Sequence, residues 1–279
     1  MVPARRSTDV NPIIVAALLG LLQGVLEWIP VSSEGGVALA STALAGLEPG
    51  DATRLALFLH AGTAVAAIGY YRGEVREILG SIRALSRRPF AEETADLSFL
   101  AIATLATGAT GLPAYFALDA AVSELEGGLF LAFVGGLLVL TGLVQRFAAA
   151  LTLGDRSRPD WVDAVFVGVL QGLAILPGVS RSGTTVSALL LRGHGGESSL
   201  RLSFLLSIPA ALAANALVLA DTGLPSLSPT EAVVALTVSA VVGYLTVGAL
   251  VELVRRVPFW TVCTVFGGLG VVGGLLVAL

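Results

Sequence analysis

One polar pattern occurs twice in this apolar sequence, first as Gly20-Leu-Leu-Gln23-Gly24 with Val31-Ser32-Ser33-Glu34-Gly35, and then as Gly168-Val-Leu-Gln171-Gly172 with Val179-Ser180-Arg181-Ser182-Gly183. A shift of 148 positions, the step from Ser32 to Ser180, superposes the copies without a gap. The identical positions in the first copy are Gly20, Leu22, Gln23, Gly24, Val31, Ser32 and Gly35. The match predicts two related halves that bring their polar turns together at one site.

The composition is that of a membrane protein. Hydrophobic residues make up 55% of the chain, charged residues only 13%, and the mean hydropathy is +0.88, whereas soluble domains average about 25% charged residues. A transmembrane β-barrel would show alternating segments of about ten residues, and no basic tract suits nucleic acid. We therefore predict an all-α polytopic membrane protein with the lipid bilayer as its surroundings and no nucleic-acid partner.

Apolar stretches of about 20 residues can cross a bilayer. About six such transmembrane helices are predicted, at 52–71, 97–118, 129–145, 202–220, 232–251 and 258–278. The stretches 12–47 and 161–193 differ, because Pro30 and Pro177 break each into two short arms. Non-helical backbone at membrane depth must be buried in protein or face water, so we interpret both as re-entrant helical hairpins.

The number of spans between the hairpins predicts their relative orientation. Three full spans separate them, so the second hairpin is inverted relative to the first, a pattern common in transporters. The chain is then a single membrane domain, 1–279, with repeat one at about 12–71 and repeat two at about 161–220.

Arginine distribution predicts the sidedness of this multi-pass protein in the cell membrane. Three connections on one side are rich in arginine: 72–92, 146–158 and the short loop with Arg255 and Arg256. Because positive loops face the cytoplasm, we expect the arginine-rich loops inside and both termini outside. The sequence leaves homodimerisation open.

In the first hairpin, Gln23 and Glu27 are four residues apart and share one helix face. An ionisable residue within a membrane segment is usually paired or hydrated, so Glu27 is a candidate cation ligand or general base; the alternative is an interfacial carboxylate. The turn that follows offers the hydroxyls of Ser32 and Ser33 and the carboxylate of Glu34. A serine can attack phosphorus when a base takes its proton, although these serines could equally cap the next helix.

In the second hairpin, Arg181 lies among hydroxyl side chains just before a new helix. The hydroxyls are those of Ser180, Ser182 and Thr185. A guanidinium group binds phosphate oxygens bidentately, and a helix N-terminus adds free N–H groups, so the segment is a candidate anion site. The alternative is an ion pair of Arg181 with Glu27 or Glu34.

Two histidines complete the candidates. His60 lies inside a predicted span and could reach the first hairpin as a base, or be a packed core residue. We expect His194 to be a cytoplasmic loop residue.

The motifs at 23–35 and 177–185, with 202–209, resemble the undecaprenyl pyrophosphate phosphatase family over most of the chain. The resemblance implies a membrane enzyme that removes the terminal phosphate from a polyprenyl diphosphate with a divalent cation, Mg²⁺ or Ca²⁺. It implies that Glu27 assists or binds the metal, and that Ser33 is the nucleophile. It assigns diphosphate binding to Ser180, Arg181 and Thr185. We add Ser32, Ser182 and Gln23 as candidate substrate-binding residues.

The first motif departs from the family at two positions. The family usually has Glu where this chain has Gln23, and His where it has Gly36. Because that His would be the base beside Ser33, we expect His60 or Glu34 to substitute, or Glu27 itself.

Three functions compete. A lipid diphosphate phosphatase fits a carboxylate, a serine and an arginine cradle. A polyprenyl-phosphate transporter or flippase would keep the anion cradle without strong chemistry, and the inverted hairpins suit it. An ion channel is disfavoured because no carboxylate ring or carbonyl filter is evident. We favour the phosphatase.

Overall fold

The computed structural model describes residues 11–29, 31–85, 88–123, 127–150, 156–225, 227–256 and 259–278. Within these ranges the chain is helical and contains no strand. The helices are α1 (Pro12–Leu26), α2 (Ser33–Ala45), α3 (Pro49–Tyr70), α4 (Arg72–Gly80), α5 (Ile82–Leu85), α6 (Ala95–Ser123), α7 (Gly127–Ala150), α8 (Trp161–Leu173), α9 (Arg181–Leu191), α10 (Gly196–Asp221), α11 (Pro229–Arg256) and α12 (Phe259–Ala278). The predicted all-α class is therefore confirmed.

Five described helices are long and apolar enough to cross a membrane. Their bounds are Pro49–Tyr70, Ala95–Ala117, Gly128–Ala148, Gly196–Asp221 and Pro229–Ala249. They correspond to five of the six predicted spans. The sixth, 258–278, is helix α12, whose apolar part Cys263–Ala278 is shorter. The chain is thus a polytopic helical protein, as predicted.

Each predicted hairpin is a pair of short helices joined by a turn, α1 with α2 and α8 with α9. Helices α2 and α9 begin at Ser33 and Arg181, which are equivalent residues under the 148-position shift. The first hairpin's Pro30 lies outside the described residues. The sequence repeat therefore corresponds to a repeat of local structure. The inverted orientation and the membrane depth of the turns stay predictions.

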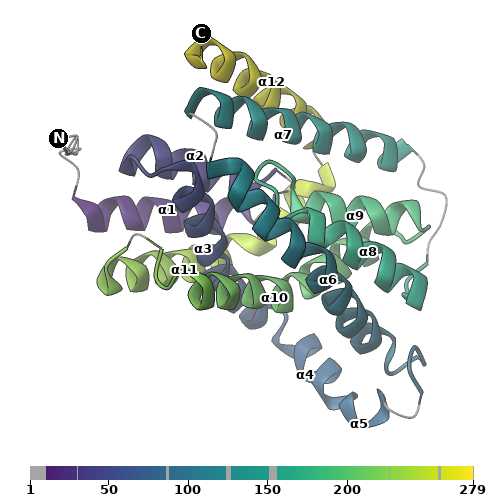
Figure 1. Ribbon diagram of the computed structural model, residues 1–279. Coiled ribbons are helices and arrows are strands. Elements are labelled where there is room, and N and C mark those ends of the chain that lie inside the picture. Colours follow the sequence, from purple (N-terminus) through teal and green to yellow (C-terminus); the bar gives the residue numbers. More distant parts are fainter. Residues whose placement is uncertain are drawn as a thin grey trace.

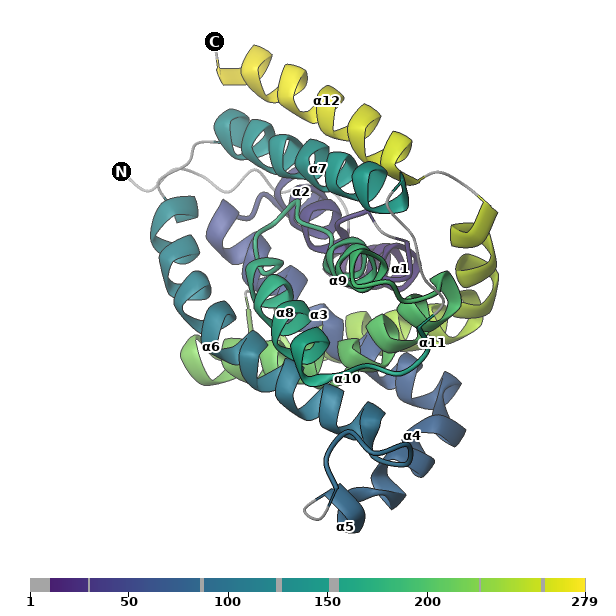
Figure 2. The same cartoon turned by 90° about the vertical axis from the view of Figure 1, so that its right-hand side faces the viewer.

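Equivalent helices of the two repeats pack in equivalent ways. Helix α1 packs on α11, and its equivalent α8 packs on α6; α3 and α10 lie against each other, as do α7 and α12. Figure 1 shows α7 and α12 together at one edge of the molecule, with α4 and α5 projecting at the opposite end. In Figure 2 the hairpin helices α8 and α9 lie in front of α1, α2 and α3, enclosed by the longer helices.

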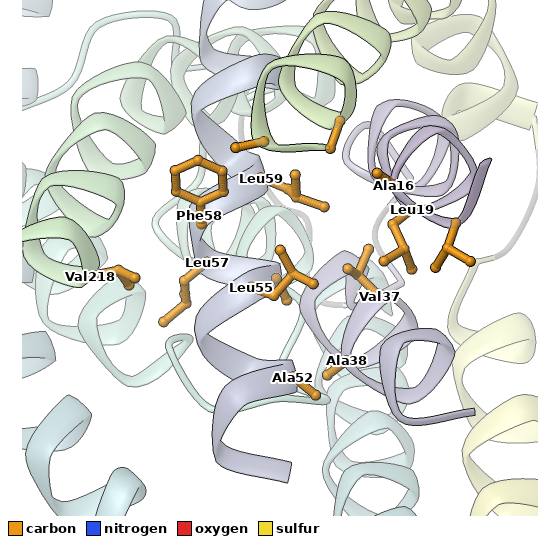
Figure 3. Packing of buried hydrophobic residues seen from close by; sticks show 14 of the residues in the cluster. Ala16, Leu19, Val37, Ala38, Ala52, Leu55, Leu57, Phe58, Leu59 and Val218 are labelled. Atoms are coloured by element: carbon orange, nitrogen blue, oxygen red, sulfur yellow. The ribbon is translucent and has the colours of Figure 1, made fainter. Parts of the chain in front are cut away.

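The core that positions the first hairpin surrounds helix α3. Leu55, Leu57, Phe58 and Leu59 of α3 are buried, and they pack with residues of α1, α2 and α10. Figure 3 shows this cluster, with Val37 of α2 and Leu19 of α1 on one side and Val218 of α10 on the other. Because helices in a bilayer associate through van der Waals packing, these close contacts hold α3 against both arms of the hairpin.

Glycines at equivalent positions allow each hairpin to approach its partner helix. A Cβ at Gly20 would collide with the carbonyl oxygen of Ala235 in α11, and a Cβ at Gly168 would collide with that of Ala103 in α6. Neither obstacle is a flexible side chain, so the backbones themselves would have to separate. The repeated glycine of the sequence pattern is therefore a close-packing requirement in both halves.

We predict that Gly20→Ala and Gly168→Ala each lower the free energy of unfolding, by about 1–3 kcal/mol, because overpacking forces backbone shifts. Thermal unfolding of the purified protein in detergent would measure the effect. The control is Gly108→Ala, where a Cβ meets no atom within 4 Å and helix propensity favours alanine. Equal melting temperatures for all three variants would contradict the close-packing interpretation.

Candidate active site at the contact of two helical hairpins

A serine hydroxyl links the turns of the two hairpins. Ser32 caps α2, its Oγ accepting from the backbone N–H of Gly35 at 3.1 Å, and the same oxygen accepts from the N–H of Gly178 at 2.9 Å. Gly178 has φ +99°, a left-handed conformation that favours glycine. This contact brings the N-termini of α2 and α9 together, which fulfils the expectation that both turns share one site.

Glu27, at the end of α1, is the centre of the hydrogen-bond network. Its side chain is 3% exposed. Its Oε2 accepts from Gln23 Nε2 at 2.9 Å and from Ser33 Oγ at 2.8 Å. The next residue, Trp28, is fully buried and donates to the Gly243 carbonyl at 3.1 Å. Glu27 is thus a fixed carboxylate within the protein, and the alternative of an exposed interfacial residue does not describe it.

His60 of α3 reaches the same carboxylate and the same serine. Its Nδ1 lies 2.8 Å from the carbonyl oxygen of Ala56, so this nitrogen is the donor. Its Nε2 lies 3.5 Å from Ser33 Oγ and 3.2 Å from Glu27 Oε2. The backbone contact therefore orients the ring of His60 so that Nε2 points at Ser33 and Glu27.

Arg181, the first residue of α9, joins the second hairpin to this group. Its Nη2 donates to Glu27 Oε1, and its Nη1 lies 3.4 Å from the carbonyl oxygen of Ser203 in α10. The ion pair that the sequence left open as an alternative is therefore present. The guanidinium still has N–H groups beyond these two described contacts, so pairing with Glu27 does not exclude binding an anion.

The hydroxyl residues around Arg181 have different positions. Ser180 caps α9, its Oγ accepting from the Gly183 N–H at 3.1 Å, and lies 3.4 Å from Ser182 Oγ. Thr185 Oγ1 lies 2.6 Å from Ser203 Oγ and 3.0 Å from the Arg181 carbonyl oxygen. Ser180 and Ser182 thus lie at the N-terminus of α9. Thr185 lies one turn further along α9 and connects this helix to α10 through Ser203.

A small cavity of about 70 Å³ lies beside these residues. Its polar lining comes from Glu34, His60, Thr107, Gln171 and Arg181, and the rest is formed by apolar residues of α3, α6, α8, the turn after α8 and α10. Glu34 Oε1 is 3.8 Å from His60 Nε2. Two lining oxygens, Glu34 Oε2 and Gln171 Oε1, are buried and have no hydrogen-bond partner within the described part of the chain. The cavity therefore combines positive charge, negative charge and unused acceptors.

Most of the predicted site residues come together here. Glu27 contacts Ser33, His60 and Arg181, and His60 also lies beside Ser33 and Glu34. Gln23 contacts Glu27. Ser32 and Ser180 act as helix caps, the role that the sequence had allowed for such serines, and Thr185 lies behind Arg181. The proximity of these residues is a fact of the fold; their roles remain predictions.

Gly36 has a simple structural environment. It lies in the first turn of α2, and a Cβ there would come 2.7 Å from Leu26 Cδ1, the end of a flexible side chain. The imidazole beside Ser33 comes instead from His60 on α3. A histidine is therefore present next to the serine although position 36 lacks one.

Two features escaped the sequence reasoning. His194 lies in the connection between α9 and α10, as a loop residue should, but it is fully buried, with Nε2 3.0 Å from Asp163 Oδ2. Asp163 also accepts from Arg192 and belongs to the capping box of α8 with Asp160. The Asp-x-x-Asp spacing at 160–163 could have indicated the cap, but only the fold brings His194 to it. The second feature is Gln171, anchored to Thr107 of α6 at 3.0 Å.

Comparison with known proteins identifies the family of this chain. A family described as bacitracin resistance protein BacA matches residues 16–272, nearly the whole chain. This chain belongs to the BacA family. A relative in Haloarcula marismortui is 82% identical over 269 residues, covering 96% of this chain and 100% of the relative.

More distant relatives of this BacA-family chain have the same name. A protein of Methanothrix thermoacetophila is 38% identical over 90% of this chain and 93% of its own length. A protein of Saccharolobus solfataricus is 33% identical over 95% of this chain and 97% of its own. All three relatives are named undecaprenyl-diphosphatase.

We predict that Glu27 and Arg181 are energetically coupled. Arg181→Met leaves Glu27 buried without its arginine, and removing one partner of a buried pair costs about 3–5 kcal/mol. Glu27→Gln removes the negative partner and leaves the guanidinium unpaired. The double variant should be less destabilised than the sum of the single variants, which a double-mutant cycle of unfolding free energies measures.

The matched control is the exposed pair Arg256 and Glu252, whose side chains are 74% and 49% exposed. Removing either residue there should have little effect, because surface ion pairs contribute at most about 1 kcal/mol. Additive losses at Glu27 and Arg181 would show that the contact carries no coupling.

Proposed function

We propose that this chain hydrolyses a polyprenyl diphosphate of the undecaprenyl type, releasing inorganic phosphate and the polyprenyl monophosphate. The product is the lipid carrier on which glycans are assembled. The observation that carries the proposal is the contact of Ser33 with both Glu27 and His60, opposite Arg181. The family and the shared name of relatives up to 82% identical support the same activity.

The terminal phosphate would bind between the two hairpins. Arg181 offers a guanidinium fork, which matches the oxygens of a phosphate. Helices α2 and α9 begin at Ser33 and Arg181, so their free N–H groups and positive dipole ends lie nearby. Ser180 and Ser182 supply hydroxyl donors at the start of α9. An anionic group is therefore favoured at the contact of the turns, next to the serine.

Ser33 would act as the nucleophile. Its Oγ attacks the terminal phosphorus, and the bond from that phosphorus to the bridging oxygen breaks. The polyprenyl monophosphate leaves, and the serine proton passes to His60 Nε2 or to Glu27 Oε2, at 3.5 and 2.8 Å from Ser33 Oγ. Such positioned bases contribute about 10²–10⁴-fold to a rate. Gln23 holds the Glu27 carboxylate in place.

A divalent cation, Mg²⁺ or Ca²⁺, is compatible with these residues. The described residues contain no group of three or more His, Cys, Asp or Glu side chains arranged around a metal. Mg²⁺, however, commonly binds one or two carboxylates together with substrate phosphates. Glu27 would hold the cation through Oε1, the oxygen that Arg181 now occupies. The bound ion would neutralise charge on the phosphate oxygens.

Transport without hydrolysis is the less favoured function. A transporter needs the anion cradle but not a hydroxyl held between a carboxylate and an imidazole. Those contacts are the ones that Ser33 makes, and the relatives are named for a diphosphatase. We therefore retain hydrolysis as the function.

We further propose that the protein lies in the cell membrane with its arginine-rich connections in the cytoplasm and both termini outside. The arginines between α3 and α6 and before α8 support this orientation through the positive-inside rule. The lipid bilayer supplies the substrate directly to the site. A homodimer is compatible with this arrangement but is not required, because the site residues all belong to one chain.

We predict that purified wild-type protein in detergent releases phosphate from a polyprenyl diphosphate in the presence of Mg²⁺. Ser33→Ala should abolish release, because the nucleophile is lost. His60→Gln should lower kcat by about 10²–10⁴-fold, because the amide cannot take the proton. Released phosphate is measured as a function of substrate concentration.

The control for the serine is Ser41→Ala, a buried hydroxyl of the same helix that donates to the Val37 carbonyl; it should retain full activity. A chelator should stop release if the cation is needed. No phosphate release by the wild-type protein with either Mg²⁺ or Ca²⁺ would disprove the hydrolase and leave the transporter.

For the orientation, we predict that a cysteine replacing Ser81, between α4 and α5, reacts with a membrane-impermeant thiol reagent only from the cytoplasmic side. The background is Cys263→Ala, which removes the buried native thiol. Leu224→Cys, at an exposed position between α10 and α11, should react only from outside. Labelling of intact cells and of inverted vesicles separates the two cases, and the opposite pattern would reverse the proposed topology.

A further inference from the structure

Gln171 is a buried polar side chain whose amide oxygen has no described partner. The residue is 3% exposed and lies near the end of α8, one turn before the Pro177 turn. Its Nε2 donates to Thr107 Oγ1 at 3.0 Å, while its Oε1 is buried and without a hydrogen bond within the described residues. A buried acceptor left unpaired costs about 1–3 kcal/mol. This cost suggests that the amide oxygen binds something during function.

The cavity next to Gln171 indicates what that partner is. Gln171 and Glu34 line the same space of about 70 Å³, which has room for about two water molecules at ~30 Å³ each. Glu34 is 8% exposed, and its Oε2 is the second acceptor without a described partner. A water molecule has two hydrogens to donate, so it can satisfy two acceptors at once. A diphosphate would instead bring further negative charge to these oxygens.

We propose that Gln171 and Glu34 hold the water molecule that completes hydrolysis, so that Gln171 is a water-positioning residue contributed by the second repeat. The inference rests on the proposed function. If the water donates to Gln171 Oε1 and Glu34 Oε2, its oxygen lone pairs face away from both acceptors. Arg181 and His60 line the same cavity, so the water lies beside the groups that hold the phosphate and Ser33.

The chemical step balances with these residues. After Ser33 has taken the phosphoryl group, the water oxygen forms a bond to phosphorus and the bond from phosphorus to Ser33 Oγ breaks. One water proton passes to Glu34, and the other stays on the phosphate that is released. Ser33 Oγ regains its proton from the base that accepted it in the first step. No redox partner or further reactant is needed.

The equivalent glutamine of the first repeat has a different partner. Gln23 Nε2 donates to Glu27 Oε2 at 2.9 Å, and Gln23 is not among the residues that line the cavity. In the second repeat, Ile175 stands at the position equivalent to Glu27. The amide of Gln171 therefore has no carboxylate four residues later in the chain, as Gln23 has. Thr107 takes its N–H group instead and leaves the amide oxygen free for water. The duplicated glutamine thus has a separate role in each half.

The test compares Gln171→Met, which keeps the length of the side chain but removes the acceptor, with Gln171→Glu, which restores one. With a polyprenyl diphosphate carrying a labelled terminal phosphate, Gln171→Met should lower kcat at least about tenfold and lower KM in the same proportion, because the slowed step follows phosphoryl transfer to Ser33. The label should accumulate on Ser33, since water attack is the slowed step. Gln171→Glu should recover much of kcat.

The control is Ser199→Ala, which removes another buried oxygen without a described partner, located away from the cavity; its kcat should equal that of wild type. Melting temperatures identify any variant that fails to fold. Thr107→Val then serves as the second variant. It removes the anchor of Gln171 together with the contacts of the Thr107 hydroxyl to the Ala103 and Gly168 carbonyl oxygens, and it should give a smaller loss of kcat and the same accumulation of label.

Several results would overturn the inference. A raised KM at unchanged kcat would make Gln171 a substrate ligand, and a shifted Mg²⁺ dependence would make it a metal ligand. A loss of kcat without label on Ser33, or no change at all, would also exclude the role in water attack. Wild-type protein that releases no phosphate would instead disprove the proposed function itself.

Discussion

The site depends on one buried ion pair that joins the two repeats. Glu27 ends α1 and Arg181 begins α9, and both side chains are almost inaccessible. Such pairs seldom add net stability, because desolvating two charges costs about as much as their attraction returns. Their value lies in placing charge where water is scarce. Here the pair fixes a carboxylate beside Ser33 and a guanidinium on the carboxylate's other oxygen. Under the proposed function, a base and an anion-binding group would thus be in place before any substrate arrives.

The neutral contacts around this pair determine how precisely it is placed. Ser32 bridges the two turns, Trp28 ties the end of α1 to α11, and the Ala56 carbonyl orients His60. Each of these hydrogen bonds contributes only about 1 kcal/mol. Together they hold the reacting groups in one arrangement, and preorganised groups need no rearrangement during reaction. The apolar core around α3 supports His60 from behind, which links packing directly to proton transfer.

The sequence predicted the helices and the meeting of the turns well, because both follow from local patterns. Apolar stretches, helix-breaking prolines and a repeated polar phrase are all visible without a structure. It could not reveal contacts between distant segments. His60 was only one of several candidate bases, since nothing in the spacing of residues 33 and 60 indicates that Nε2 points at Ser33. The burial of His194 within its loop was missed for the same reason, because its partner Asp163 is 31 positions away.

The duplication explains how one frame produces two different chemistries. Ser33 and Arg181 are the same position of the repeat, each the first residue of a helix that follows a capping serine. Because the turns touch, the two copies of this position lie in the same part of the molecule. Two serines would leave no charge to hold a phosphate, and two arginines would repel each other and supply no nucleophile. Under the proposed function, divergence at a single equivalent position would therefore separate attack from anion binding, and the shared caps and glycines would hold the two residues near one phosphate.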